Sequence, residues 1–132
     1  MIRTASESDI PEIERLMRSE PRFWNEEWPA DVLRKAIHAS DGLAFVWEEG
    51  AICGFVCAHN LGFRGYLSEL IVSKTARGKN VGAQLLERIE DELGARGCPL
   101  VIADIWKSAE PFYRKARWKS PGVVLLAKKI KR

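Results

Sequence analysis

The sequence has 132 residues, which predicts a single domain able to bury roughly two-thirds of the surface that its unfolded chain exposes. Its 46% hydrophobic and 30% charged residues are typical of a folded domain, and no apolar stretch reaches the ~18 residues of a membrane span. The net charge of +3 is too small to favour nucleic-acid binding. No apolar signal segment opens the chain, so we expect a cytoplasmic protein without a membrane partner.

The first third of the chain predicts a strand and two helices. A short strand at residues 1–4 precedes a helix over 10–18, whose start shows the spacing of a capping box headed by Asp9. A second helix is expected over 29–40. The loop between the helices, residues 20–28, is rich in aromatic and acidic side chains. It either packs as a lid on the core or lines a pocket where an acid attracts a cationic amine.

The middle of the chain predicts an antiparallel meander followed by a helix. Strands are expected over 43–48, 52–61 and 66–72, joined by turns short enough for hairpins. The polar segment 73–80 then leads into an amphipathic helix over 81–93. Its apolar stripe consists of Val81, Leu85, Leu86, Ile89 and Leu93.

The last third predicts a buried strand, a short helix and an edge strand. The nearly continuous apolar run at 100–106 suggests a strand covered on both faces, and strand–helix–strand order predicts a right-handed parallel crossover. A helix over 109–116 and a strand over 123–130 follow. That edge strand could pair with a second copy of the chain, which would make a homodimer. Four basic residues at its end are interpreted as solvated, with contact to a nucleic acid or an acidic partner as the alternative: Lys128, Lys129, Lys131 and Arg132.

Cysteine and histidine usage gives little sign of special chemistry. Cys53, Cys57 and Cys98 contain no Cys-x-x-Cys pair, and one of them must stay unpaired, so we expect no disulfides. Cys53 and Cys57 lie in an apolar strand, where we expect buried thiols. His38 and His59 are too few and too isolated for a metal site, and we expect no metal.

The polar segment before the amphipathic helix predicts a phosphate-binding loop. A helix N-terminus offers unpaired N–H groups to an anion, and Arg77 and Lys79 add two cationic side chains. The spacing excludes a Walker loop and a Gly-x-Gly-x-x-Gly dinucleotide fingerprint. What remains is the pattern Arg77-x-x-Asn80-x-Gly82-Ala83.

This pattern resembles the pyrophosphate-binding signature of the GNAT superfamily of acyl-CoA-dependent N-acyltransferases. Asn80 replaces the usual Gly, and because Asn tolerates a left-handed backbone, the loop should keep its shape. Residues 109–118 are similar to a second family motif, Ala-x-x-Phe-Tyr-x-Lys-x-Gly-Phe, with Arg117 and Trp118 in place of Gly and Phe. The order of elements is also similar. The resemblance therefore implies an α/β fold over residues 1–132, with a mixed, mostly antiparallel sheet, one parallel β-α-β unit and helices on both faces.

The resemblance also implies acetyl-CoA as co-substrate and an amine as acceptor. In the family, the strand before the loop holds the acetyl group and the pantetheine arm, and the loop holds the pyrophosphate. These roles fall on Leu70, Ile71, Val72, Arg77, Gly78, Lys79, Asn80, Val81, Gly82 and Ala83. A later cofactor-binding Asn of the family corresponds to Trp106, so Ser108 or Lys107 is the expected substitute.

Attack of an amine on a thioester requires a neutral nucleophile and a proton or hydrogen bond for the departing thiolate. Tyr113 suits the second task because its ordinary pKa of ~10 is close to the ~8.5 of a thiol, and the resemblance implies the same role. A core aromatic beside Phe112 is the alternative. Glu69 and Asp104 are the candidate bases, with His59 or an ordered water as further options.

The expected function is therefore transfer of an acetyl group from acetyl-CoA to a primary amine in a direct ternary complex. The sequence does not identify the acceptor, for which a small molecule and a protein amine both fit. The alternative from another class is a non-catalytic module that binds acyl-CoA as a sensor or an interaction domain.

Overall fold

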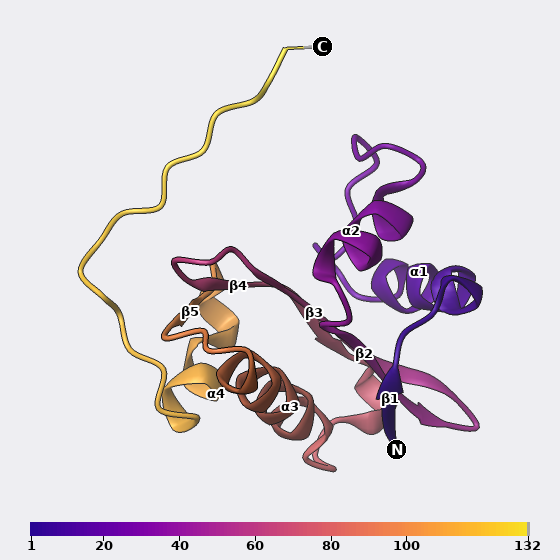
Figure 1. Ribbon diagram of the computed structural model, residues 1–132. Helices are drawn as coiled ribbons and strands as arrows, with labels where there is room; N and C mark the ends of the chain where they lie inside the picture. Colours follow the sequence, from indigo (N-terminus) through magenta and orange to yellow (C-terminus); the bar gives the residue numbers. More distant parts are fainter. Residues whose placement is uncertain (132) are drawn as a thin grey trace.

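The chain folds around a five-stranded sheet whose spatial order follows the sequence, β1-β2-β3-β4-β5 (Figure 1). The computed structural model describes residues 1–131. Its strands are β1 (Ile2–Thr4), β2 (Ala44–Glu49), β3 (Ala51–Asn60), β4 (Gly65–Val72) and β5 (Val101–Ile102). The first four pair antiparallel, whereas β4 and β5 pair parallel across α3 (Val81–Ala95). The predicted mixed sheet with one parallel β-α-β unit is confirmed.

Helices cover both faces of the sheet (Figure 1). On one face lie α1 (Ile10–Arg18) and α2 (Val32–Ser40), and on the other lie α3 and α4 (Glu110–Lys115). All five residues of the predicted α3 stripe are buried in a core with Phe45 and Val56, which confirms the helical period of this segment. Three single-turn 3₁₀ helices complete the list: η1 (Glu7–Asp9), η2 (Lys74–Ala76) and η3 (Lys107–Ala109). Within residues 1–131, no helix has the length and apolarity needed to cross a membrane.

The start of α1 differs from the sequence-based expectation. The capping box joins Ser6 and Asp9, three residues before the predicted one, because Asp9 also makes two hydrogen bonds of 2.8 Å with Arg3 of β1. These bonds lower the pKa of Asp9 to about 2. Glu12, the expected partner in the box, instead accepts a 2.6 Å hydrogen bond from the backbone N–H of Ile52.

A bulge in β4 decides which side chains face which helices. The β3–β4 register shifts between Cys57 and Ala58, so Ser68 is an extra residue on β4. Leu70 therefore joins the core under α3 although it lies three positions after Leu67, which faces the same side. Glu69 occupies the opposite face, the one covered by α1 and α2.

The two strands predicted nearest the C-terminus are the main errors. Only Val101–Ile102 of the expected strand 100–106 is a strand, and Leu100, Ile105 and Trp106 are exposed because no strand lies beyond β5 in residues 1–131. The expected edge strand at 123–130 is not a strand either. Residues 119–131, the C-terminal arm, run as an extended trace that does not join the sheet (Figure 1). Arg132, the last of the four basic residues, lies outside the described part of the chain.

The three cysteines are free thiols. Cys57 is buried, and burial raises its pKa to about 11, whereas Cys53 and Cys98 are only half-buried. Cys57 thus fits the predicted role of a small core residue, and Cys53 does so only in part.

Candidate active site

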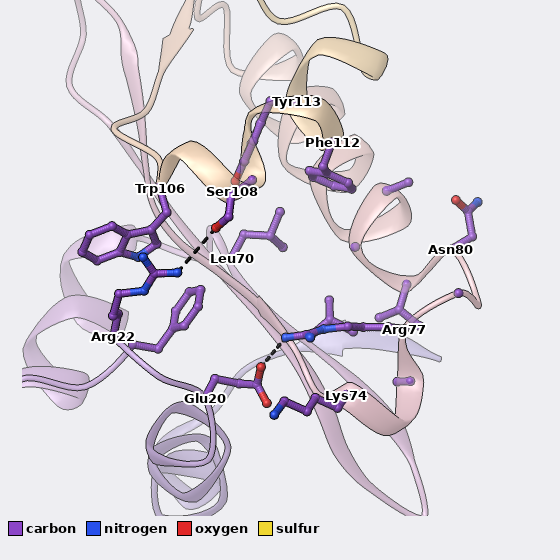
Figure 2. A pocket seen from close by; sticks show the side chains of 18 of the residues that line it. Glu20, Arg22, Leu70, Lys74, Arg77, Asn80, Trp106, Ser108, Phe112 and Tyr113 are labelled. Atoms are coloured by element: carbon purple, nitrogen blue, oxygen red, sulfur yellow. Dashed lines mark hydrogen bonds and ion pairs between the residues drawn. The ribbon is translucent and has the colours of Figure 1, made fainter.

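A cleft opens where β4 and β5 separate. The two strands pair only at Gly65–Val101 and Tyr66–Ile102, which leaves the edge of β4 beyond Tyr66 without a strand partner in residues 1–131. A cavity of about 860 Å³ lies against this edge, the N-terminus of α3 and the start of α4 (Figure 2). Ten predicted site residues line it: Leu70, Val72, Arg77, Gly78, Asn80, Val81, Gly82, Ala83, Ser108 and Tyr113.

Two predicted cofactor-binding residues do not line this cleft. The side chain of Ile71 is buried in the core under α1 and α2, because alternation along β4 turns it away from Leu70 and Val72. Lys79 is exposed outside the cleft, and Lys74 of η2 supplies a lining cation instead. The sequence favoured Lys79 because it lies within the motif, whereas Lys74 reaches the cleft only through the turn at η2.

The loop before α3 has the backbone shape that an anion site needs. Asn80 lies in the left-handed region with φ 65° and ψ 19°, which confirms that Asn can take the place of Gly here. Gly78 is also left-handed, with φ 85°. A Cβ on Gly82 would lie 3.4 Å from the ring of Phe112, so the missing side chain keeps the floor of the cleft open. The first turn of α3 therefore presents its unpaired N–H groups beside an open cavity.

A buried carboxylate, absent from the sequence-based site, faces this loop. Glu20, which follows α1, accepts a hydrogen bond from Arg77 in a salt bridge (Figure 2). The side chain of Glu20 is only 5% exposed. No signal in the sequence separates Glu20 from the other acids of its loop, since its partner lies 57 positions away.

Arg22 is a second residue that sequence reasoning missed. Its guanidinium stacks 4.7 Å from the ring centroid of Trp106 and donates a long hydrogen bond of 3.5 Å to Ser108 (Figure 2). Its positive φ of 71° turns the loop toward the cleft. The sequence gives one indication of this role: Arg22 belongs to the loop 20–28, for which lining a pocket is one of the two expected roles.

A second cavity of about 430 Å³ adjoins the first, between the loop after α1, strand β4 and the segment after β5. Six residues line both cavities, which therefore meet there: Arg22, Phe23, Leu70, Trp106, Ala109 and Tyr113. The second cavity contains Glu69 and Asp104, the two predicted bases. It is therefore a candidate acceptor pocket beside a candidate cofactor cleft.

The aromatic loop serves both of the roles considered for it. Phe23 and Trp28 line the second cavity. Trp24 lines neither cavity; it packs edge-to-face against Trp28 at 5.2 Å between ring centroids and lies under the guanidinium of Arg18. The three rings thus all pack against the core under α1 and α2, and Phe23 and Trp28 also form a wall of the second cavity.

The pKa of the Glu69 carboxyl group is raised above its ordinary value. Burial, and secondly the negative charge of Asp104, raise its pKa to about 7. Asp104 is exposed after β5 and accepts a hydrogen bond from the hydroxyl of Tyr66. Burial and this hydrogen bond raise the pKa of Tyr66, which therefore stays a donor to Asp104.

Tyr113 occupies the junction of the two cavities. Its ring is wedged between Phe112 and Trp118, with centroids 5.1 Å and 5.3 Å away, and the residue is only 7% exposed. Its hydroxyl has no hydrogen-bond partner among residues 1–131. Burial, and secondly the charge of Glu69, raise its pKa to about 12, so Tyr113 keeps its proton at neutral pH.

His59 does not join the site. It lies 3.2 Å from the hydroxyl of Ser68 and lines neither cavity. Its contact with the bulge residue fits a structural histidine, the alternative to a catalytic role.

Comparison with known proteins identifies relatives of this architecture. The sequence model of the acetyltransferase (GNAT) family matches residues 10–117. A protein of Pectobacterium atrosepticum named as an acetyltransferase is 30% identical over 112 residues, which cover 83% of this chain and 79% of that protein.

Solved structures resemble the fold over nearly all of its length. A Bacillus halodurans protein described as a transcriptional regulator superposes with a TM-score of 0.79 at 19% identity, covering 98% of this chain and 99% of its own. The NatC complex bound to Gag peptide and CoA contains a chain with a TM-score of 0.71 at 17% identity, covering 89% of this chain and 82% of that one. At these identities the likeness concerns the fold alone.

Proposed function

Because the chain belongs to the acetyltransferase (GNAT) family, we propose that it transfers an acetyl group from acetyl-CoA to a primary amine by direct attack in a ternary complex. The main support is that Tyr113 lines both cavities, so one hydroxyl can reach a thioester in the first and an amine in the second. The acceptor is a small-molecule amine or a protein amine.

The first cavity suits the coenzyme in charge and shape. The α3 N-terminus, Arg77 and Lys74 would hold the pyrophosphate, since they combine helix N–H groups with two cations. The free edge of β4 at Leu70 and Val72 would offer backbone hydrogen bonds to the pantetheine arm. When bound there, acetyl-CoA supplies a thioester carbon that an amine can attack.

Glu69 is the proposed base. Moving a proton from a lysine-like amine of pKa ~10.4 to a carboxylate of pKa about 7 costs about 4.6 kcal/mol, against about 8 kcal/mol for an ordinary carboxylate. Burial of Glu69 thus removes much of the barrier to forming the neutral amine. The charge of Asp104 adds to the effect and also attracts the ammonium form of the acceptor into the pocket.

Tyr113 is the proposed donor to the departing sulfur. With its pKa near 12 and a thiol at ~8.5, complete proton transfer is uphill by about 5 kcal/mol, so a hydrogen bond to the developing thiolate is the favoured contribution. Once Glu69 has taken the amine proton, its charge no longer raises the pKa of Tyr113. Proton uptake at Glu69 therefore makes Tyr113 a better donor when the thiolate forms.

The test is release of free thiol from acetyl-CoA with a panel of amines. We expect turnover that falls at least about tenfold in Tyr113→Phe, with coenzyme affinity unchanged by calorimetry. Phe63→Leu is the control, because this aromatic side chain is exposed and lines neither cavity. Coenzyme binding without thiol release for any amine would instead support the non-catalytic acyl-CoA-binding module, and normal turnover in Tyr113→Phe would disprove its role.

A further inference from the structure

The C-terminal arm leaves an apolar segment of the chain uncovered. Val123, Val124, Leu125 and Leu126 are between 71% and 87% exposed, and Ile130 is 79% exposed. No backbone hydrogen bond joins residues 119–131 to the sheet. Such a β-branched and aliphatic run has the composition of a strand, and both of its backbone edges are free to pair.

The sheet has an open edge of the matching kind at β5. This strand pairs with β4 on one side and, within residues 1–131, with nothing on the other. Leu100, Ile105 and Trp106 flank it and are exposed. An unpaired strand edge beside exposed apolar side chains is a template for one more strand.

We propose that two copies of the chain exchange their C-terminal arms, each arm joining the sheet of the other copy at β5. An arm folded onto its own β5 would pair along one backbone edge and leave the other edge and its apolar side chains exposed. Two exchanged arms can also pair with each other across a twofold axis, so both edges of each arm are satisfied.

The junction between α4 and the arm favours exchange. Trp118 is anchored by its indole N–H, which donates a 3.0 Å hydrogen bond to Glu90 of α3. Only residues 119–122 separate it from the apolar segment, and they include Pro121 and Gly122, the latter with φ 77°. A hinge this short that directs a strand outward makes pairing within one chain harder and pairing between chains easier.

Two side chains of the arm contact the surface around the second cavity. Leu125 lines the second cavity, and Lys129 lies 3.4 Å from Glu27 of the loop after α1. In the exchanged dimer these contacts would come from the arm of the second copy, so each acceptor pocket would be completed by its partner. This last consequence rests on the proposed function, whereas the exchange itself does not.

The first experiment measures the oligomeric state by light scattering coupled to size exclusion. We expect a mass twice the 14.9 kDa of one chain. Leu126→Pro, which removes a backbone donor in the middle of the arm, should give a monomer that still unfolds in one cooperative transition. Lys131→Pro, beyond the apolar segment, is the matched control and should stay dimeric. A monomeric parent chain, or a dimer that survives Leu126→Pro, would overturn the proposal.

The second experiment separates exchange from pairing within a chain. Unlabelled and nitrogen-15-labelled chains, each carrying a photoreactive residue in place of Leu126, are unfolded together, refolded and cross-linked. Exchange predicts arm peptides joined to a β5 peptide of the other isotope, which mass spectrometry detects. If every arm–β5 pair carries a single isotope, the arms are not exchanged.

The third measurement connects the dimer to the site. In Leu126→Pro we expect a higher KM for the acceptor and an unchanged Kd for acetyl-CoA, since the arm borders only the second cavity. An active monomer would contradict exchange and leave the proposed function standing. A dimer with exchanged arms that releases no thiol would support the exchange and contradict the proposed function.

Discussion

Glu20 and Arg77 form a salt bridge that ties the loop after α1 to the loop before α3. The Glu20 side chain is almost fully buried, whereas the Arg77 side chain is 54% exposed and lies along the cleft wall. Arg77 is the first residue of the motif that predicted pyrophosphate binding. The salt bridge therefore holds the Arg77 side chain in place before the pyrophosphate binds. It also places the negative charge of Glu20 beside the expected anion.

The two effects of Glu20 oppose each other, and their sizes decide the first prediction. Ordering one long side chain is worth about 0.5–1.5 kcal/mol, whereas like charges ~6 Å apart at an effective dielectric of ~20 repel by about 3 kcal/mol before salt screening. Glu20→Gln keeps an acceptor for Arg77 and removes the charge. We expect acetyl-CoA to bind about tenfold more tightly at low salt, with the gain shrinking as salt rises.

Isothermal titration at several salt concentrations measures this effect. Glu26→Gln is the matched control, because Glu26 belongs to the same loop, is exposed and lines neither cavity. Weaker coenzyme binding in Glu20→Gln would show that ordering of Arg77 outweighs repulsion.

Local signals in the sequence predicted the parts of the fold that depend on neighbouring residues. The 3.6-residue stripe beginning at Val81 located α3 to within two residues of its end, and the tolerance of Asn for a left-handed backbone anticipated Asn80. Tyr113, Glu69 and Asp104, which line the two cavities, were predicted through a motif or as an acid in an apolar run. Each of these signals lies within a few positions of the residue that it concerns.

The missed features depend on contacts between distant parts of the chain. Glu20 meets Arg77 across 57 positions and Arg22 meets Ser108 across 86, and neither spacing leaves a pattern in the sequence. The apolar composition of the arm favours a strand by propensity, but residues 123–130 are not a strand in the structure. A strand requires a partner, however, and propensity does not say which chain supplies it.

The pH dependence of turnover should reveal Glu69 as the base. Because its pKa is raised to about 7, kcat/KM should fall as the pH drops below about 7, and Glu69→Gln should lower kcat by about 10²–10⁴-fold. Asp104→Asn removes the second cause of the shift, so the acidic limb should move to lower pH. A Glu69→Gln enzyme with the acidic limb of the parent would assign the base to another group or to water.

The same shift makes a prediction about stability, with its sign set by burial. The folded state binds the Glu69 proton more tightly than the unfolded chain does, so the ionised carboxylate destabilises the fold above about pH 7 and has no such cost below about pH 4.5. At about pH 8, Glu69→Gln should raise the free energy of unfolding by about 1–3 kcal/mol, and near pH 4 it should change little.

Denaturant unfolding at the two pH values checks this difference. Glu87→Gln on the exposed face of α3 is the surface control, expected to stay within about 0.5 kcal/mol of the parent at both. Equal effects of Glu69→Gln at both pH values would contradict a raised pKa.

The turn after α4 supports Tyr113 at a cost in backbone strain. Arg117 has φ 73°, and this left-handed residue turns the chain so that the N–H of Trp118 donates to the carbonyl of Tyr113 at 3.0 Å, beside the stacked rings. The left-handed conformation costs a non-glycine residue roughly 1–2 kcal/mol, while glycine has more entropy to lose on folding.

Arg117→Gly should therefore stabilise the protein by about 0.5–1 kcal/mol without changing turnover. Thermal unfolding tests this, with Arg114→Gly inside α4 as the control, expected to destabilise by about 1 kcal/mol because no positive φ is relieved there. A loss of stability in Arg117→Gly would mean that the arginine side chain makes a contact worth more than the strain of its backbone.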